Sequence, residues 1–304
     1  MPMLPLPPDT PQTIGSYRVA AKLGEGGMGE VFLASSPSRR LVAVKLIRSE
    51  LLGDAHWRER FRREVASARS VSGFYTAPVV DADPDAERPW LATQYIKGVS
   101  LSAAVTAKGP LPEQAACRLG AGLAEALIAI HGAGIVHRDL KPSNVLLAAD
   151  GPRVIDFGIA RPLDAVPLSR SLILGTPAYM SPEQALGEAV TPLSDVFSLG
   201  ATLVYAAVGK GPFGTGHKVR GRIAYGEPDL EGLPDPLRGL VTRCLSKEAS
   251  DRPSPEQVLT ALSTLLDAHY GEEWLPAEVA HLIGEHEQTV TEATAVLPRH
   301  FETG

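Results

Sequence analysis

The stretch HRDLKPSN places three basic side chains and one carboxylate within eight residues, between two apolar segments. The motif DFG follows and begins at Asp156. The oxygen atoms of Asp139, Asn144 and Asp156 are ligands of the kind that Mg²⁺ prefers in proteins. Arg138 and Lys141 are cations that can face phosphate groups. An ordinary polar turn is the alternative, but the charges are explained if the cluster faces the reacting end of a nucleoside triphosphate.

The segment GEGGMGEV places Gly24, Gly26 and Gly29 at the spacing G-x-G-x-x-G. In a dinucleotide-binding fold a helix would begin after the third glycine, but here the strand-like run EVFLASS follows. A glycine turn between antiparallel strands forms a flap whose backbone amides can close over phosphates, because no Cβ atom blocks their approach. A flexible hairpin without a ligand is the alternative interpretation.

A lysine and a glutamate in neighbouring predicted elements form a further candidate pair. Lys45 lies in the strand-like run LVAVKLI, on the same face as Ala43, because alternate residues of a strand share a face. In the helical segment DAHWRERFRREVASARS, Glu64 lies on the apolar stripe that contains Trp57 and Phe61. A carboxylate on a buried stripe is costly unless it is paired, so we expect an ion pair between Lys45 and Glu64. A carboxylate at the rim of the stripe is the alternative.

The elements that must position these residues differ between the two parts of the chain. From Tyr17 to about Ile96, strand-like runs alternate with glycine turns, with one helical insert. From about Leu101 to Leu266, apolar residues follow the helical period. A β-rich part followed by an α-rich part predicts an α+β chain of two unequal lobes.

Composition narrows the functional class. The net charge of −6 argues against a nucleic-acid-binding surface, which would be basic and clustered. No apolar run approaches the roughly 18 residues that a membrane span needs. The two cysteines, Cys117 and Cys244, lie far apart in apolar contexts, which indicates buried thiols and a reducing compartment. We therefore expect a cytoplasmic protein with no nucleic-acid partner and no membrane span.

Seven motifs occur in order along the chain: LGEGGMGEV, VAVK, HRDLKPSN, DFG, GTPAYMSPE, SDVFSLG and DRP. Their order and spacing resemble those of the eukaryotic-like (Hanks-type) serine/threonine protein kinases of bacteria, from about Tyr17 to Leu266. The resemblance implies a bilobal protein-kinase fold with a small β-rich N-lobe, one regulatory helix and a larger helical C-lobe. The expected boundaries are a proline-rich leader at 1–14, a kinase domain at 15–268 with its lobes at about 15–96 and 97–268, and a tail at 269–304 with a short amphipathic helix from Pro276.

The resemblance also implies an ATP site beneath the glycine flap. Val31 would pack on the adenine, Thr93 would be the gatekeeper, and the carbonyl of Gln94 and the amide of Ile96 would bind the adenine edge. The full set of implied ATP-binding residues is Leu23, Gly24, Glu25, Gly26, Gly27, Met28, Gly29, Val31, Ala43, Lys45, Thr93, Gln94 and Ile96.

The implied chemistry is transfer of the ATP γ-phosphate to serine or threonine. Lys45, paired with Glu64, would contact the α and β phosphates. Asp139 would accept or orient the substrate hydroxyl, and Lys141 would stabilise the moving phosphate. The implied metal is Mg²⁺, with Mn²⁺ as an alternative, and its ligands would be Asn144 and Asp156.

The segment from Asp156 to Glu183 is the implied activation loop. Its candidate phosphorylation sites are Ser169, Ser171 and Thr176, the last of which would also hydrogen-bond Asp139 and Lys141. A phosphorylated loop residue would be neutralised by Arg138. Three further residues have implied structural roles: Glu183 would pair with Arg252, and Asp195 would anchor the catalytic loop from a buried helix.

Two other functions use the same fold. A pseudokinase or scaffold would lack the equivalent of Lys45, Asp139 or Asp156, and this chain has all three. A small-molecule phosphotransferase usually lacks the GTPAYMSPE segment. Protein substrates are the implied partners. A homodimer through the N-lobe, and a phosphothreonine-binding protein at the tail segment QTVTEATAV, are further candidates.

Overall fold

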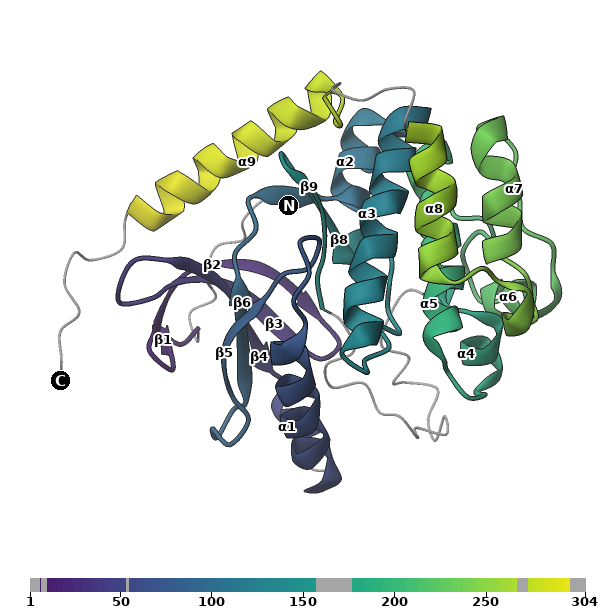
Figure 1. Cartoon of the computed structure of the whole chain (residues 1–304). Helices are drawn as coiled ribbons and strands as arrows, with labels where there is room; N and C mark the ends of the chain where they lie inside the picture. Colours follow the sequence, from purple (N-terminus) through teal and green to yellow (C-terminus); the bar gives the residue numbers. More distant parts are fainter. Residues whose placement is uncertain (1–5, 7–9, 53–54, 157–176, 267–272, 296–304) are drawn as a thin grey trace.

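The computed structural model describes residue 6 and residues 10–52, 55–156, 177–266 and 273–295. These residues form two lobes, a smaller one built on an antiparallel sheet and a larger one built mainly of helices (Figure 1). The predicted α+β bilobal architecture is confirmed.

The N-lobe sheet has six strands in the order β1-β2-β3-β4-β6-β5, and every neighbouring pair is antiparallel. Its strands are β1 (Thr13–Ile14), β2 (Tyr17–Gly26), β3 (Gly29–Ser35), β4 (Leu41–Ile47), β5 (Val79–Asp83) and β6 (Trp90–Gln94). Lys45 on β4 lies opposite Val31 on β3 and Leu91 on β6. The sheet register therefore holds this lysine in place, with β3 on one side and β6 on the other.

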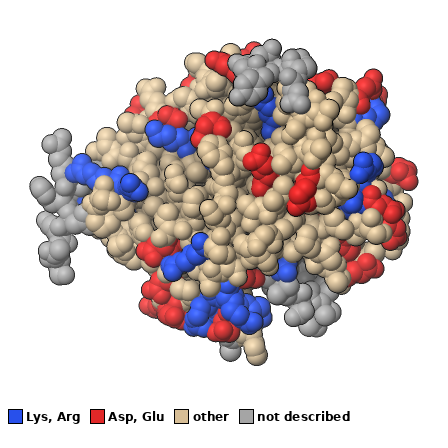
Figure 2. All heavy atoms as spheres, viewed as in Figure 1, with Lys and Arg blue, Asp and Glu red and all other residues tan. Residues whose placement is uncertain are grey.

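Helix α1 (Ala55–Ser70) is the helical insert of the N-lobe. Trp57 and Phe61 are buried, as the apolar period predicts, and their rings stack with centroids 5.0 Å apart. Burying side chains of this size stabilises the fold by about 1.5–3 kcal/mol each. The opposite side carries Glu59, which pairs with Arg62. Figure 2 shows the resulting mixture of basic and acidic side chains at the lower edge of the molecule, over α1.

The C-lobe is organised around helix α3, which contacts α5 and α8. Its helices are α2 (Leu101–Lys108), α3 (Glu113–Gly132), α4 (Pro182–Leu186), α5 (Pro192–Val208), α6 (Val219–Tyr225), α7 (Asp235–Cys244) and α8 (Pro255–Leu266). Gly120 on α3 permits the close approach of α8, since a Cβ atom at this position would lie 2.7 Å from Leu262 Cδ1. Both cysteines are buried, as predicted. Short 3-10 turns occur at Ser49–Leu51, Pro142–Asn144, Pro177–Tyr179 and Ala249–Asp251.

A second, three-stranded sheet interrupts the helical part, which the sequence pattern did not predict. It contains β7 (Gly98–Ser100), β8 (Val145–Ala148) and β9 (Gly151–Val154). The stretch HRDLKPSN ends where β8 begins, and Asp156 follows β9. This small sheet therefore brings the two polar motifs to one place.

Helix α9 (Ala277–Ala295) forms the described part of the tail. It begins after Pro276 and is longer than the short helix that we expected. The polar segment after residue 286 continues as helix because Val290 is buried and Ala293 packs against the same cluster. The sequence alone gave no partner for these two residues.

A buried ion pair links α4 to the segment before α8. Arg252 donates from Nη1 to Glu183 Oε1 at 2.7 Å and from Nη2 to Oε2 at 2.9 Å. Ser194 Oγ also donates to this carboxylate. Burial alone would raise the pKa of Glu183, but the hydrogen bonds from Arg252 and Ser194 hold that pKa at about 2.

The substitution Glu183→Gln should therefore lower the free energy of unfolding at pH 7 by about 3 kcal/mol, because it leaves the Arg252 guanidinium buried without its charge partner. The folded-state pKa of Glu183 lies below its ordinary value of 4.5. The wild-type advantage is therefore complete above about pH 5 and shrinks as the pH falls toward 2. Urea unfolding of both proteins across this range measures it.

Glu59→Gln is the matched control, since Glu59 pairs with Arg62 at an exposed site, where ion pairs contribute little. An equal loss of stability in both variants, or a Glu183→Gln deficit that does not change with pH, would contradict this account of the buried pair.

Candidate active site

A pocket of about 440 Å³ lies between the lobes, and residues from both line it. Every residue of the predicted ATP-binding set lines this pocket. The four predicted catalytic and metal-binding residues of HRDLKPSN and DFG also line it: Asp139, Lys141, Asn144 and Asp156. Sequence motifs that are more than a hundred residues apart are thereby brought to one cavity.

The glycine flap is the turn between β2 and β3, where Gly26 pairs with Gly29. A Cβ atom at Gly29 would lie 2.2 Å from the carbonyl oxygen of Leu46, so only glycine fits against β4 here. Buried Lys22 donates to Glu25 at 2.7 Å and to Glu30 at 2.9 Å. The two carboxylates and this lysine tie the strands together close to the turn.

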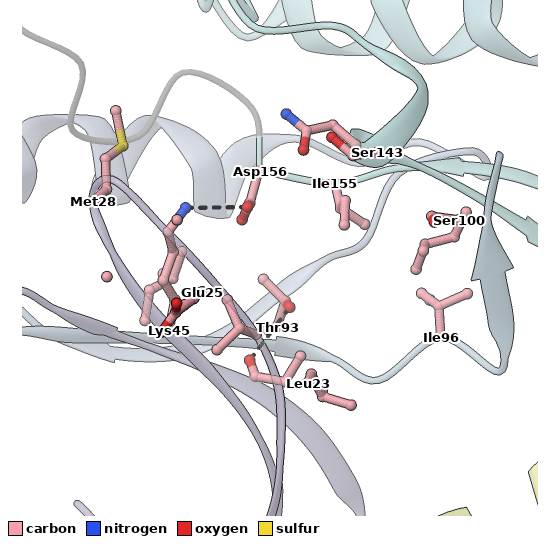
Figure 3. Close-up of a pocket in the computed structure, with 18 of the residues that line it drawn as sticks. Leu23, Glu25, Met28, Lys45, Thr93, Ile96, Ser100, Ser143, Ile155 and Asp156 are labelled. Carbon is pink, nitrogen blue, oxygen red and sulfur yellow. Dashed lines mark hydrogen bonds and ion pairs between the residues drawn. The ribbon is translucent and has the colours of Figure 1, made fainter. Parts of the chain in front are cut away.

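Lys45 points across the pocket toward Asp156, and the two side chains form an ion pair at 3.1 Å (Figure 3). Asp156 has φ of 59°, a left-handed conformation that is uncommon for residues other than glycine. Strained backbone of this kind is concentrated at functional sites. Glu64 is half-buried on α1, and its pairing with Lys45 stays a prediction.

Asp139 lies in a network with two residues of the same loop. Lys141 Nζ is 3.0 Å from Asp139 Oδ2. Asn144 Nδ2 donates to the backbone carbonyl of Asp139 at 2.8 Å and to Oδ2 at 3.2 Å. Both bonds use the amide nitrogen of Asn144, so Oδ1 is the atom of that side chain able to bind a metal.

The donor set fits Mg²⁺. An amide oxygen of Asn144 and the carboxylate of Asp156 are hard ligands in one pocket, and Mg²⁺ commonly takes one or two protein ligands and completes its shell with phosphates and water. The described residues contain no group of three or more His, Cys, Asp or Glu side chains that could hold a metal ion alone. A metal that binds together with a nucleotide agrees with this composition.

Asp195, in the first turn of α5, fixes the backbone of the segment HRDLKPSN, residues 137–144, which is the candidate catalytic loop and is called the catalytic loop below. Its side chain is fully buried and accepts hydrogen bonds from the amides of His137 at 2.7 Å and Arg138 at 2.8 Å. His131 Nε2 lies 2.8 Å from the same carboxylate. Arg138 has φ of 64°, so the two hydrogen bonds between Asp195 and these backbone amides hold a strained backbone immediately before Asp139.

His137 connects the catalytic loop to the strand that precedes Asp156. The amide of Asp139 donates to His137 Nδ1 at 3.1 Å, and His137 Nε2 is 3.2 Å from the carbonyl oxygen of Ile155. The side chain is buried. One imidazole therefore sets the relative position of two candidate functional aspartates.

Eight residues line the pocket that the sequence analysis did not name. They are Leu91, Tyr95, Gly98, Ser100, Ser143, Leu146, Ile155 and His286. Leu146 lies in the apolar run that follows Asn144, and the sequence analysis did not recognise this run as strand β8. His286 carries no local signal, since it belongs to α9, at the far end of the chain.

The three candidate phosphorylation sites cannot be compared with the structure. Ser169, Ser171 and Thr176 lie outside the described residues, and their roles stay predictions. Glu183 and Arg252 form the ion pair described above, away from the pocket lining.

The sequence matches the protein kinase domain family over residues 17–262. It is 52% identical over 283 residues to PkwA, a probable serine/threonine-protein kinase of Thermomonospora curvata, and the match covers 92% of this chain and 38% of that protein. The serine/threonine-protein kinase AfsK of Streptomyces coelicolor is also 52% identical over 283 residues, covering 90% of this chain and 35% of its own length. The chain belongs to the protein kinase family.

A comparison with solved structures also identifies the protein-kinase fold. The crystal structure of the Mycobacterium tuberculosis PknI kinase domain matches with a TM-score of 0.67 and 26% sequence identity, over 83% of this chain and 97% of that one. The resemblance to bacterial serine/threonine protein kinases that the motifs predict is thus confirmed. The chain spans 38% and 35% of the length of the two relatives named above.

Replacing Asp195 by Asn should disturb the catalytic loop, because the new amide group places a donor against backbone donors. One unsatisfied buried hydrogen-bonding group costs about 1–3 kcal/mol, and urea unfolding should show a loss of this size. If the protein is active, kcat should fall while KM for ATP changes little, because Asp195 does not line the pocket.

The matched control is Asp235→Asn, which changes an exposed aspartate in the first turn of α7. Loss of stability in Asp195→Asn with an unchanged kcat would show that Asp195 supports the fold without orienting the catalytic loop.

Proposed function

We propose that the chain transfers the γ-phosphate of ATP to serine or threonine hydroxyls of protein substrates. The observation that carries the proposal is the convergence of Lys45, Asp139, Lys141, Asn144 and Asp156 in one pocket beneath a glycine flap. A cation, a carboxylate base and two hard oxygen donors are the groups that phosphoryl transfer requires. The names of the relatives support serine and threonine as acceptors.

Asp139 would act on the substrate hydroxyl. Its carboxylate lines the pocket beside Lys141, so a hydroxyl that enters from outside can donate its proton to Asp139 while its oxygen approaches the γ-phosphate. Lys141 would stabilise negative charge on the transferred group. The loop contributes by holding these groups in position, since phosphoryl transfer leaves little covalent chemistry to the protein.

When the nucleotide binds, Lys45 and Asp156 would exchange their mutual ion pair for different ligands. Their ion pair places a cation and a carboxylate side by side at the phosphate end of the pocket (Figure 3). Lys45 would contact the α and β phosphates, and Asp156 with Asn144 would hold Mg²⁺, with Mn²⁺ as an alternative. When bound, the metal neutralises charge on the phosphate oxygens.

The adenine would bind at the opposite end of the pocket, against the hinge, which is the three-residue connection (95–97) between β6 and β7. Val31 and Ala43 line the pocket from the N-lobe, Leu146 lines it from the C-lobe, and the ring would lie between them. The carbonyl of Gln94 and the amide of Ile96 would bind the adenine edge. Apolar side chains above and below a flat ring are typical of nucleotide pockets.

Control by autophosphorylation is part of the proposal. Ser169 and Ser171 are the preferred sites, and Thr176 is better suited to hydrogen-bond Asp139 and Lys141. A phosphate on the loop would be neutralised by Arg138, whose backbone is already fixed by Asp195. Arginine–phosphate pairs of this kind order activation loops.

The remaining hypotheses concern partners and location. The tail threonines Thr289, Thr291 and Thr294 each donate to the carbonyl four residues earlier within α9, so each hydroxyl would have to leave this hydrogen bond before it could be phosphorylated. The phosphothreonine-binding partner and the N-lobe homodimer stay predictions. A cytoplasmic location rests on the cysteine content. Among the described residues, no helix has the length and apolar character that crossing a membrane requires.

Two alternatives remain within the same fold. A pseudokinase or scaffold would bind nucleotide without transferring phosphate, and the joint presence of Lys45, Asp139 and Asp156 in the pocket disfavours it. A small-molecule phosphotransferase would phosphorylate a metabolite and no protein.

Incubation with Mg²⁺ and ATP should add phosphate to the wild-type protein, and peptide mapping should find it on Ser169 or Ser171. Lys45→Met and Asp139→Asn should lower the rate by about 10²- to 10⁴-fold. Lys210→Met and Asp229→Asn are matched controls, because this exposed ion pair lies outside the pocket lining. ATP binding without any phosphate transfer would favour the scaffold.

A further inference from the structure

Helix α9 lies outside the residues that match the kinase domain family, yet it contacts both lobes. Figure 1 shows it crossing from above α2 toward β2 of the N-lobe. Its contacts include β2 of the N-lobe, β7 next to the hinge, and α2 of the C-lobe. The helix therefore runs along one side of the junction between the lobes.

Apolar side chains anchor the helix at both ends. Val279 and Ile283 are 2% and 4% exposed and belong to the main hydrophobic core, which contains most of the buried C-lobe side chains. Val290 is 5% exposed and packs with Ala21 and Leu33 of the N-lobe. Burial of this extent at two sites fixes the middle of the helix over the hinge.

The middle of the helix makes a polar contact with the hinge, residues 95–97. Tyr95 Oη lies 3.2 Å from His286 Nε2, and both side chains are half-buried and line the nucleotide pocket. A second, exposed contact joins Lys97 to Glu287 at 3.8 Å. Exposed ion pairs contribute little, so the bond between Tyr95 and His286 is the stronger link.

Both partners are neutral near pH 7. Burial, with the nearby charge of Glu287, raises the pKa of Tyr95 to about 12. Burial lowers the pKa of His286. A tyrosine hydroxyl can donate or accept, so it can pair with Nε2 in either tautomer of the imidazole.

We propose that His286 is a positioning residue of the nucleotide site, which holds Tyr95 so that the adjacent backbone of Gln94 and Ile96 is preorganised for adenine. This inference rests on the proposed ATP-dependent function. Only three residues connect β6 to β7, so a side-chain bond at the first of them restricts the whole connection. Preorganisation of a binding segment increases affinity because less conformational entropy is lost on binding.

Titration of the purified chain with ATP and with adenosine, by calorimetry, tests the inference. His286→Ala and Tyr95→Phe should each raise Kd for both ligands by about 3- to 10-fold, the range expected for one lost hydrogen bond. The Kd of the double variant should be no higher than the higher Kd of the two single variants, because both substitutions remove the same hydrogen bond. His286→Gln, which can still donate and accept, should restore much of the affinity, and kcat should change less than KM.

His281→Ala is the matched control, since His281 is an exposed histidine of the same helix, 72% exposed. It should bind both ligands as the wild type does. An unchanged Kd in His286→Ala, additive effects in the double variant, or tighter binding in either single variant would overturn the positioning role while leaving the proposed function intact. Failure of the wild type to bind ATP would overturn both proposals.

Discussion

The buried carboxylate of Asp195 is the interaction on which the rest of the site depends. It accepts hydrogen bonds from two successive backbone amides of the catalytic loop and contacts His131 at the end of α3. A fully buried carboxylate is tolerated only when hydrogen bonds replace its hydration. The fold supplies those donors by bending the loop into a strained conformation at Arg138, and that bend is what places Asp139 in the pocket.

The two lobes are held in relation to each other by different kinds of contact at the two ends of the pocket. At one end, Lys45 from the sheet meets Asp156 from the C-lobe. At the other end, α9 buries apolar side chains in both lobes and contacts Tyr95 of the hinge. One end is therefore joined by charge, and the other mainly by apolar burial.

Much of the fold and site can be predicted from the sequence because the relevant signals are local. The apolar period predicts the burial of Trp57 and Phe61, and the strand after Gly29 separates this flap from a dinucleotide fold. The ordered motifs predict the residues that line the pocket. The strands β7 and β8 escape prediction because each has at most four residues and they pair across more than forty residues of sequence. His286 escapes it because its partner Tyr95 is 191 residues away.

The central claim is that this chain transfers phosphate to protein hydroxyls, and the most direct test is a time course with γ-labelled ATP, Mg²⁺ and casein, followed by acid hydrolysis to identify the labelled amino acid. The account predicts label on phosphoserine or phosphothreonine of casein that increases with time and depends on Mg²⁺. Label that stays in ATP, although the protein binds the nucleotide, would contradict the claim and assign the chain a binding role.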